Sequence, residues 1–294
     1  FDKWIEQNIP GYGNGWEPYP LSLRIVNLVK WLSCHPDTHQ RWLSSLNQQA
    51  HALSLQPEYH ILGNHLFANA KALTFVGCYL VDAEAYLDLG LKLLDREIKE
   101  QFLEDGGHFE LSPMYHSILL WDILELIELA YTSKNKKLLL RLQCLKLVAL
   151  RGLTWLSCMS HPDGEISFFN DRSIGIAPSP SKIFQYAKSL DLPFDINKTP
   201  LKTLQSSGYS IIVKNSYTLI FDHAKVGPDF LPGHAHADTL SFEMSIGEQR
   251  VFVNSGTSLY GLSKERLRQR KTPAHNTISV DSYDSSQVWS GFRV

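Results

Sequence analysis

The stretch Tyr209-Ser-Ile-Ile-Val-Lys-Asn-Ser-Tyr-Thr-Leu-Ile-Phe221 decides the fold of this 294-residue chain. It contains two short runs of β-branched and aromatic residues, 209–213 and 217–221, on either side of a polar turn. This composition and length are typical of β-strands. Similar runs follow at 240–246, 251–253 and 277–280. The sequence therefore predicts that the last third of the chain is built from strands.

The chain before this stretch has a different periodicity. From about residue 19 to residue 192, apolar residues recur at spacings of three and four, as in Leu21, Ile25 and Leu28. This spacing places them on one face of an α-helix, and turn signals separate six to eight such helices. The segment 138–158 is apolar on more than one face, which is expected of a helix packed from two sides. We therefore predict inner and outer layers of helices.

Helices followed by strands indicate an α+β protein with two segregated parts. The polar stretch 197–207 marks the boundary, so we expect a helical domain over residues 1–196 and a domain built from strands that starts at residue 197. The second part ends at Val294 without an evident closing strand, and the first residue is Phe1 rather than methionine. We therefore expect an incomplete sheet in a piece of a longer protein.

The composition excludes several classes of protein. Apolar residues make up 44% of the chain, and 28 basic residues nearly balance 30 acidic ones, which is typical of a globular protein and disfavours nucleic acid as a partner. The most apolar stretch, 138–160, contains Arg141, Lys146 and Arg151, so we predict no transmembrane segment. The four cysteines form no CxxC pair and indicate neither a zinc knuckle nor a disulfide framework.

A histidine pair gives the sharpest functional signal. His234 and His236 lie in Gly233-His-Ala-His-Ala-Asp238, and His275 precedes another predicted strand. Neighbouring strands of one sheet would bring these histidines together, and in a loop His234 and His236 can point in different directions. One histidine could then serve a substrate while the other binds a metal or packs. The alternative is a set of exposed loop histidines.

Zinc needs three or four nitrogen, sulfur or oxygen ligands, and His236 with His275 supplies two of them. Asp238 or Asn254 could supply a third, although the neutral amide of Asn254 is a weaker ligand than a carboxylate. The sequence alone leaves two interpretations open: a bound metal, or a hydrogen-bonded histidine pair.

The helical part also contains candidate site residues. Asn64 and His65 stand at the start of a predicted helix, where Asn64 could simply be the N-cap. Tyr115 lies in the first turn of another helix and is either an acid or base or a core residue. Trp16 and Glu17 could contact the face of a sugar ring or pack inside the protein.

A basic segment, 266–271, contains Arg266, Arg268, Arg270 and Lys271. Such a run is either a solvated loop or an anion-binding loop, because guanidinium groups match carboxylate and sulfate.

No GxSxG, P-loop, GxGxxG or HExxH motif is present in the sequence. Hydrolysis of a glycosidic bond would need two carboxylates across a cleft. Four acidic residues are candidates for such a pair: Glu17, Asp105, Glu110 and Asp171.

Six motifs, in this order along the chain, resemble the heparinase II/III-like polysaccharide lyases. They are Gly15-Trp-Glu-Pro-Tyr-Pro-Leu-Ser-Leu-Arg24, Gly63-Asn-His-Leu66, Asp105-Gly-Gly with Ser112-Pro-Met-Tyr-His116, Gly233-His-Ala-His-Ala-Asp-Thr-Leu-Ser-Phe242, Asn254-Ser-Gly-Thr257 and Ala274-His-Asn-Thr277. The resemblance implies an incomplete (α/α) toroid followed by an antiparallel β-sandwich. It also implies an anionic uronate polysaccharide as partner, and a periplasmic or secreted bacterial enzyme.

The resemblance further implies β-elimination at a 4-linked uronate of a glycosaminoglycan, of alginate or of another exopolysaccharide. In such a reaction Asn64 and His65 would neutralise the uronate carboxylate. Tyr115 would protonate the leaving oxygen, and on syn substrates it would also take the C5 proton, which requires a phenol pKa lowered by positive charge. His234 would be the other base.

By the same resemblance, His236, Asn254 and His275 would hold a zinc ion, although relatives more often carry aspartate at the position of Asn254. Arg266 and Arg270 would face substrate anions. Two rival functions stay open: a non-catalytic glycan-binding relative that serves polysaccharide assembly or export, and a glycoside hydrolase built on a toroid.

Overall fold

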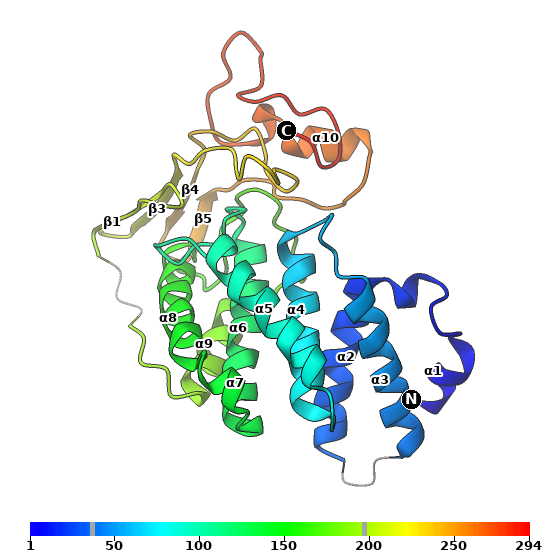
Figure 1. The fold of residues 1–294 in the computed structure, drawn as a ribbon. Helices are drawn as coiled ribbons and strands as arrows, with labels where there is room; N and C mark the ends of the chain where they lie inside the picture. The colour runs from blue at the N-terminus through cyan, green and yellow to red at the C-terminus, as the bar shows by residue number, and fades with distance from the viewer. Residues whose placement is uncertain (36–38, 196–198) are drawn as a thin grey trace. The chain divides into compact units, whose positions relative to one another are not determined.

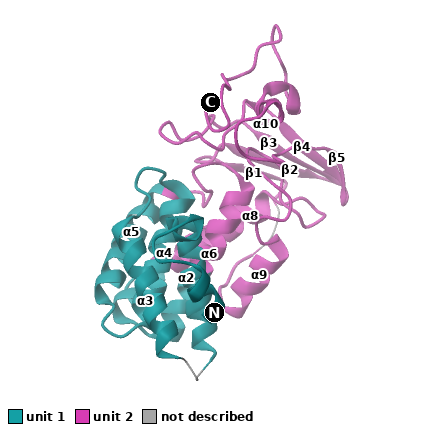
Figure 2. Cartoon of the chain, turned by 90° about the vertical axis from the view of Figure 1, so that its right-hand side faces the viewer, with its two compact units in different colours: residues 1–100, 125–143 teal, residues 101–124, 144–294 magenta. Residues whose placement is uncertain are grey.

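The computed structural model describes residues 1–35, 39–195 and 199–294 (Figure 1). The predicted boundary at residues 196 and 197 lies outside the described residues. The described chain divides into two compact units, the first formed by residues 1–100 and 125–143 and the second by residues 101–124 and 144–294 (Figure 2). No helix within the described residues is long and apolar enough to span a membrane.

The first unit is helical. Its elements are α1 (Asp2–Gln7), η1 (Asn14–Trp16), α2 (Pro18–Ser33), α3 (Gln40–Leu55), α4 (Gly63–Tyr79), most of α5 (Glu84–Gln101), the end of α6 (Pro113–Ser133) and α7 (Lys136–Leu139). Helix α2 packs against both α3 and α4. It buries Leu21, Ile25 and Val29, which confirms the period of three and four. Helix α4 is buried along almost its whole length, as an inner helix should be.

Two glycines allow α4 and α5 to approach closely. A Cβ atom at Gly77 would lie 2.5 Å from the backbone nitrogen of Leu87, and one at Gly90 would lie 2.7 Å from that of Thr74. Atoms this close would clash, and backbone atoms cannot move aside as a flexible side chain can. The two glycines therefore fix the spacing of the helix pair.

A buried carboxylate joins three helices of the first unit. Glu125 accepts hydrogen bonds from the ammonium groups of Lys30 and Lys71. Burial by itself raises the pKa of Glu125, but the charges of Lys71 and Lys30 outweigh this effect and hold the pKa below its ordinary value. The carboxylate is therefore ionised in the folded protein at neutral pH.

Replacing Glu125 with glutamine should lower the free energy of unfolding by about 3 kcal/mol, because the substitution leaves Lys71 buried beside a neutral group. The difference between wild type and variant in the free energy of unfolding should reach its full size above pH about 4.3, the pKa of a glutamate in the unfolded chain. It should vanish as the pH falls through the lower pKa that Glu125 has in the folded protein. Urea unfolding at several pH values measures it. Arg141→Ala, which breaks an exposed pair with Asp95, should change the unfolding midpoint little, and an equal effect of both substitutions would contradict this account.

The second unit combines helices with one sheet. Its elements are the start of α6, most of α8 (Leu142–Cys158), α9 (Pro180–Ser189), β1 (Leu201–Leu204), β2 (Tyr209–Lys214), β3 (Tyr217–Asp222), β4 (Phe242–Ile246), β5 (Gln249–Phe252), α10 (Lys264–Arg270) and η2 (Thr272–Ala274). The five strands pair in sequence order and every pair is antiparallel. This agrees with the predicted strands and with the predicted α+β class.

Three local predictions need correction. The segment 277–280 is not a strand: within the described residues it makes only an isolated pairing between Val280 and Tyr283, and Ile278 is 82% exposed. Strand β1 was not predicted, because it falls in the stretch assigned to the domain boundary. The basic segment is largely helix α10 instead of a loop, and the side chain of Ser263 caps it by accepting a hydrogen bond from the backbone amide of Arg266.

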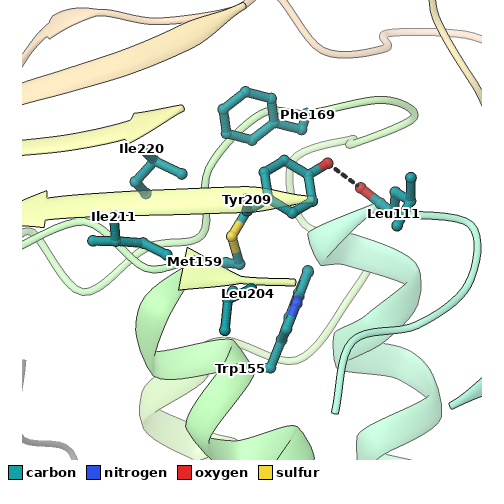
Figure 3. Packing of buried hydrophobic residues seen from close by; sticks show 8 residues of the cluster. All are labelled: Leu111, Trp155, Met159, Phe169, Leu204, Tyr209, Ile211 and Ile220. Carbon is teal, nitrogen blue, oxygen red and sulfur yellow. Dashed lines mark hydrogen bonds between the residues drawn. The ribbon is translucent and has the colours of Figure 1, made fainter. Parts of the chain in front are cut away.

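One face of the sheet packs on the helical part of the second unit. Figure 3 shows the cluster that fills this interface, formed by Leu111, Trp155, Met159, Phe169, Leu204, Tyr209, Ile211 and Ile220. The Tyr209 hydroxyl donates a hydrogen bond to the Leu111 carbonyl oxygen at 2.8 Å, so the buried hydroxyl is satisfied. The cluster thereby holds the loop that leads from Leu111 into α6.

The opposite face of the sheet is half exposed. Strand alternation places Ile212, Tyr217 and Ile246 on this face, and these side chains are 41%, 47% and 41% exposed. Phe242 and Phe252 lie on the same face, with ring centroids 5.5 Å apart. The sheet is therefore apolar on both faces, whereas a sheet with one solvated face alternates apolar and polar residues.

Candidate active site

In the second unit the structure brings together two of the predicted catalytic residues. Tyr115 lies in the first turn of α6, is 8% exposed, and stacks its ring on the imidazole of His234, with centroids 4.0 Å apart and planes 11° from parallel. The Tyr115 hydroxyl donates a hydrogen bond to the hydroxyl of Tyr260 at 3.2 Å. Pro113 starts this helix, and Ser112 fixes its entry by donating to the Asp171 carbonyl oxygen at 2.7 Å.

A buried carboxylate holds His234 from the other side. Oε2 of Glu110 lies 3.1 Å from Nδ1 of His234. Burial by itself lowers the pKa of His234, but the Glu110 carboxylate outweighs this and raises it above its ordinary value. Burial raises the pKa of Glu110 in turn, and His234 outweighs that effect, so the net shift is downward. The two groups therefore stabilise each other's charged forms.

Another histidine lies behind this pair. Nδ1 of His108 is 3.8 Å from Oε2 of Glu110, which is too long for a hydrogen bond, and Nε2 of His108 contacts Oε1 of Gln101 at 3.1 Å. Complete burial lowers the pKa of His108 to about 4, so its ring is neutral at physiological pH. Of these two histidines, only His234 therefore lies within hydrogen-bond distance of Glu110.

The acidity of Tyr115 differs from the sequence-based expectation. Burial raises the pKa of its phenol, and Tyr260, Asp171 and Glu110 raise it further. A role as base would require a lowered pKa, because the phenolate would have to be populated. In this structure the phenol is protonated, which suits a proton donor.

Asp171 is the centre of a buried polar cluster next to these residues. Its carboxylate accepts a bidentate hydrogen bond from Arg266, with Nη2 2.7 Å from Oδ2. Oδ1 also accepts from the Thr257 hydroxyl at 2.9 Å and lies 2.8 Å from Nε2 of His236. Burial raises the pKa of Asp171, but His236 and Arg266 outweigh it and hold the pKa well below the ordinary value. This carboxylate is therefore a permanent anion.

Arg266 and Arg270 are fully buried and have protein partners. The Arg270 guanidinium donates to the carbonyl oxygen of Ala235 through Nε at 3.0 Å and Nη2 at 2.7 Å. Ala235 lies between His234 and His236, so Arg270 holds the backbone of the histidine segment. The expected contact of both arginines with substrate anions stays a prediction.

The predicted metal ligands lie close together. The rings of His236 and His275 have centroids 5.2 Å apart, and Asn254 is buried with its Oδ1 accepting from the backbone amide of Asn276 at 3.2 Å. Nδ1 of His236 has no hydrogen-bond partner among the described residues. Over the same residues, no group of three or more His, Cys, Asp or Glu side chains could hold a metal. The two imidazoles therefore lie near each other, the amide oxygen of Asn254 already accepts a hydrogen bond, and the binding of a metal by these three residues stays a prediction.

In the first unit, His65 is also held by a carboxylate. Its Nδ1 lies 2.9 Å from Oε1 of Glu58, and its ring lies against Tyr19, with centroids 4.4 Å apart. Asn69 fixes Glu58 by donating to Oε2 at 3.0 Å. Asn64 is buried in the first turn of α4, and it is not the N-cap, because the residue that precedes the helix is Leu62.

Trp16 and Glu17 differ in exposure. Trp16 is buried in η1, 6.0 Å from the ring of Trp4, and its carbonyl oxygen accepts from Nε2 of Gln56 at 3.1 Å. These contacts favour the packing interpretation of Trp16. Glu17 is exposed at the start of α2 and stays a candidate for contact with substrate.

Three of the carboxylates considered for a hydrolase are buried or bound within the second unit. Asp105 accepts from the backbone amide and the hydroxyl of Ser207 at 2.7 and 2.9 Å. Asp171 binds Arg266, and Glu110 binds His234. The geometry therefore gives them roles in holding other groups.

Comparisons with known proteins agree with this picture. Two family models match the chain: Heparinase II/III N-terminus over residues 1–188, and Heparinase II/III-like, C-terminal over residues 196–294. The sequence is 26% identical to heparin-sulfate lyases of Bacteroides stercoris and Pedobacter heparinus, over 98% and 96% of this chain and 47% of each relative. A crystal structure of heparinase III matches with a TM-score of 0.79 and 21% identity, over 96% of this chain and 50% of that one.

The chain thus spans about half the length of the curated relatives it matches. The structural likeness confirms the predicted α+β fold with an (α/α) toroid and an antiparallel sheet, and the described strands form one five-stranded sheet of the predicted β-sandwich.

Proposed function

We propose that this chain, which belongs to the heparinase II/III family, carries the catalytic residues of a polysaccharide lyase that cleaves a uronate-containing glycosaminoglycan by β-elimination. The observation that carries the proposal is the stack of Tyr115 on His234, with Glu110 bonded to the far side of the imidazole. It pairs a protonated phenol with a histidine that can accept a proton. One acid and one base are what an elimination requires.

In the proposed reaction, Nε2 of His234 takes the C5 proton of the uronate, and the electron pair left behind forms the C4–C5 double bond. The bond from C4 to the leaving oxygen breaks, and the Tyr115 hydroxyl gives its proton to that oxygen. Negative charge builds on the uronate carboxylate as the C5 proton leaves, so donors at the carboxylate lower the barrier. Asn64 and His65 are the proposed donors. Because Nδ1 of His65 contacts Oε1 of Glu58, His65 would donate from Nε2 only when both of its ring nitrogens carry a proton.

The proposed substrate is heparan sulfate. The sequence alone leaves other glycosaminoglycans, alginate and exopolysaccharides open, and the two curated relatives are both heparin-sulfate lyases. A periplasmic or secreted location in a bacterium belongs to the same proposal.

The test is ultraviolet absorbance during incubation of the full-length protein with heparan sulfate, chondroitin sulfate and alginate in parallel. We expect absorbance to rise on heparan sulfate, because elimination leaves an unsaturated uronate. New reducing ends without absorbance would support the glycoside hydrolase instead. Binding without either signal would support the non-catalytic glycan binder.

We also propose that His236, His275 and the amide oxygen of Asn254 hold a zinc ion. Two observations support the fit. Asp171 contacts Nε2 of His236, and metal-binding histidines commonly donate their second nitrogen to a carboxylate. Burial lowers the pKa of His275 to about 3, which keeps its ring neutral, as a ligand must be. A bound zinc would stiffen the segment that carries His234.

Replacing Asn254 with aspartate should raise the affinity for zinc by about tenfold or more, because a carboxylate adds negative charge at the metal. Competition with a chromophoric chelator measures the affinity, and atomic absorption gives the stoichiometry. Asn215→Asp, in the turn between β2 and β3, adds the same charge elsewhere and should leave the affinity unchanged. If neither wild type nor Asn254→Asp retains zinc, the zinc proposal is wrong.

A further inference from the structure

We infer that Glu110 is a positioning residue of the proposed elimination, which holds His234 in the tautomer that leaves Nε2 free to take the C5 proton. This inference rests on the proposed function. Glu110 does not touch the reacting atoms in this scheme and acts only through His234.

The first support is the direction of the hydrogen bond. An ionised carboxylate can only accept, so Nδ1 of His234 must donate to Oε2 of Glu110 across their 3.1 Å separation. The pKa of Glu110 is below its ordinary value, which agrees with an ionised group. In a neutral imidazole the second nitrogen then carries a lone pair. Glu110 thus makes Nε2 the basic nitrogen.

The second support is that the other contacts of His234 leave the tautomer open. Tyr115 stacks on the face of the ring and fixes its plane. The backbone amide of Asp171 donates to the carbonyl oxygen of His234 at 3.1 Å, and Arg270 holds Ala235. These contacts place the ring and its backbone, whereas the proton on Nδ1 is set by the contact with Glu110.

The third support is the charge that develops during the reaction. His234 becomes an imidazolium when it takes the C5 proton, and the carboxylate of Glu110, which is buried and 3.1 Å from Nδ1, stabilises that cation. Nδ1 of the neighbouring His108 is 3.8 Å from Oε2 of Glu110, which is too long for a hydrogen bond, so His108 does not compete with His234 for that oxygen. A buried acid that orients a catalytic histidine serves the same purpose in serine proteases, where the amide substitution costs about 10⁴ in kcat by favouring the wrong tautomer.

The decisive variant is Glu110→Gln in the full-length protein, assayed on the polymer that wild type cleaves. We expect kcat to fall by about 100-fold or more, with KM changed by less than about threefold, because the base is impaired while the binding groups are kept. The matched control is Glu243→Gln, which alters a second fully buried glutamate bonded to a histidine: Oε2 of Glu243 lies 2.9 Å from Nε2 of His161. Its kcat should stay near wild type.

A spectroscopic readout separates positioning from a merely structural role. Long-range proton–nitrogen correlation spectra of histidine-labelled protein report which ring nitrogen carries the proton, and a His234→Gln sample assigns the signal. We expect the Nδ1–H form in wild type and a shift toward Nε2–H in Glu110→Gln. An unchanged tautomer would overturn the inference.

The activity outcomes are also distinguishable. A wild-type protein that is inactive on every polymer overturns the proposed function. If wild type is active and Glu110→Gln has a similar kcat, only the role of Glu110 is overturned. An equal loss of kcat in Glu243→Gln overturns that role as well.

If Glu110→Gln fails to fold, Glu110→Asp replaces it. The aspartate side chain is one methylene shorter, so kcat should fall at least about tenfold while KM is kept. A wild-type kcat in Glu110→Asp would overturn the inference.

Discussion

Replacing Tyr115 with phenylalanine is expected to lower kcat for β-elimination by about 10²- to 10⁴-fold, the range for one general acid. The substitution removes the hydroxyl but keeps the ring, so the stack on His234 and the fold should persist. The leaving oxygen would then depart without a proton donor. Initial rates from ultraviolet absorbance on the cleaved polymer measure the loss.

The control for this variant is Tyr217→Phe, which removes a hydroxyl from a tyrosine that is 47% exposed on the outer face of the sheet. Its kcat should match that of wild type. A Tyr115→Phe variant with nearly normal kcat would show that the leaving oxygen takes its proton from another group.

The second large effect is expected for His234→Ala. Loss of the imidazole removes the base, so kcat should fall by about 10²- to 10⁴-fold. KM should change less, because the proposed carboxylate donors Asn64 and His65 are untouched. Circular dichroism should confirm the fold, since the substitution also leaves Glu110 buried without its histidine partner.

His223→Ala is the matched control, because His223 is an exposed histidine of the same unit whose Nε2 contacts the hydroxyl of Ser210. It should keep full activity. If both Tyr115→Phe and His234→Ala cleave the polymer at nearly the wild-type rate, the assignment of this acid and base is wrong.

Periodicity alone was sufficient to predict most secondary structure. The three- and four-residue spacing of Leu21, Ile25 and Val29 is imposed by the α-helix, so it can be read without tertiary information. The prediction of a strand at 277–280 was wrong. A β-branched composition shows only that these residues would tolerate a strand, and within the described residues no neighbouring strand pairs with them. Strand β1 forms for the opposite reason, since pairing with β2 outweighs its weak local signal.

The site was predicted in part. Tyr115 and His234 were identified through family motifs, and the structure places their rings in contact. The partnership of Glu110 with His234 joins residues 124 apart in the sequence, and no local pattern indicates such a tertiary contact. The raised pKa of Tyr115 was missed for the same reason, because burial and neighbouring carboxylates are properties of the folded chain.

The apolar outer face of the sheet has a practical consequence for anyone who shortens this chain for expression. Ile212, Leu219 and Met244 lie side by side in register on this face, and apolar patches drive association in water unless other protein covers them. Lys202 and Lys214 are exposed and supply some charge near the edge strand, which discourages strand-to-strand pairing but does not cover the face. A soluble fragment of the sheet would therefore need polar substitutions at the exposed apolar positions of this face, such as Ile212 and Ile246.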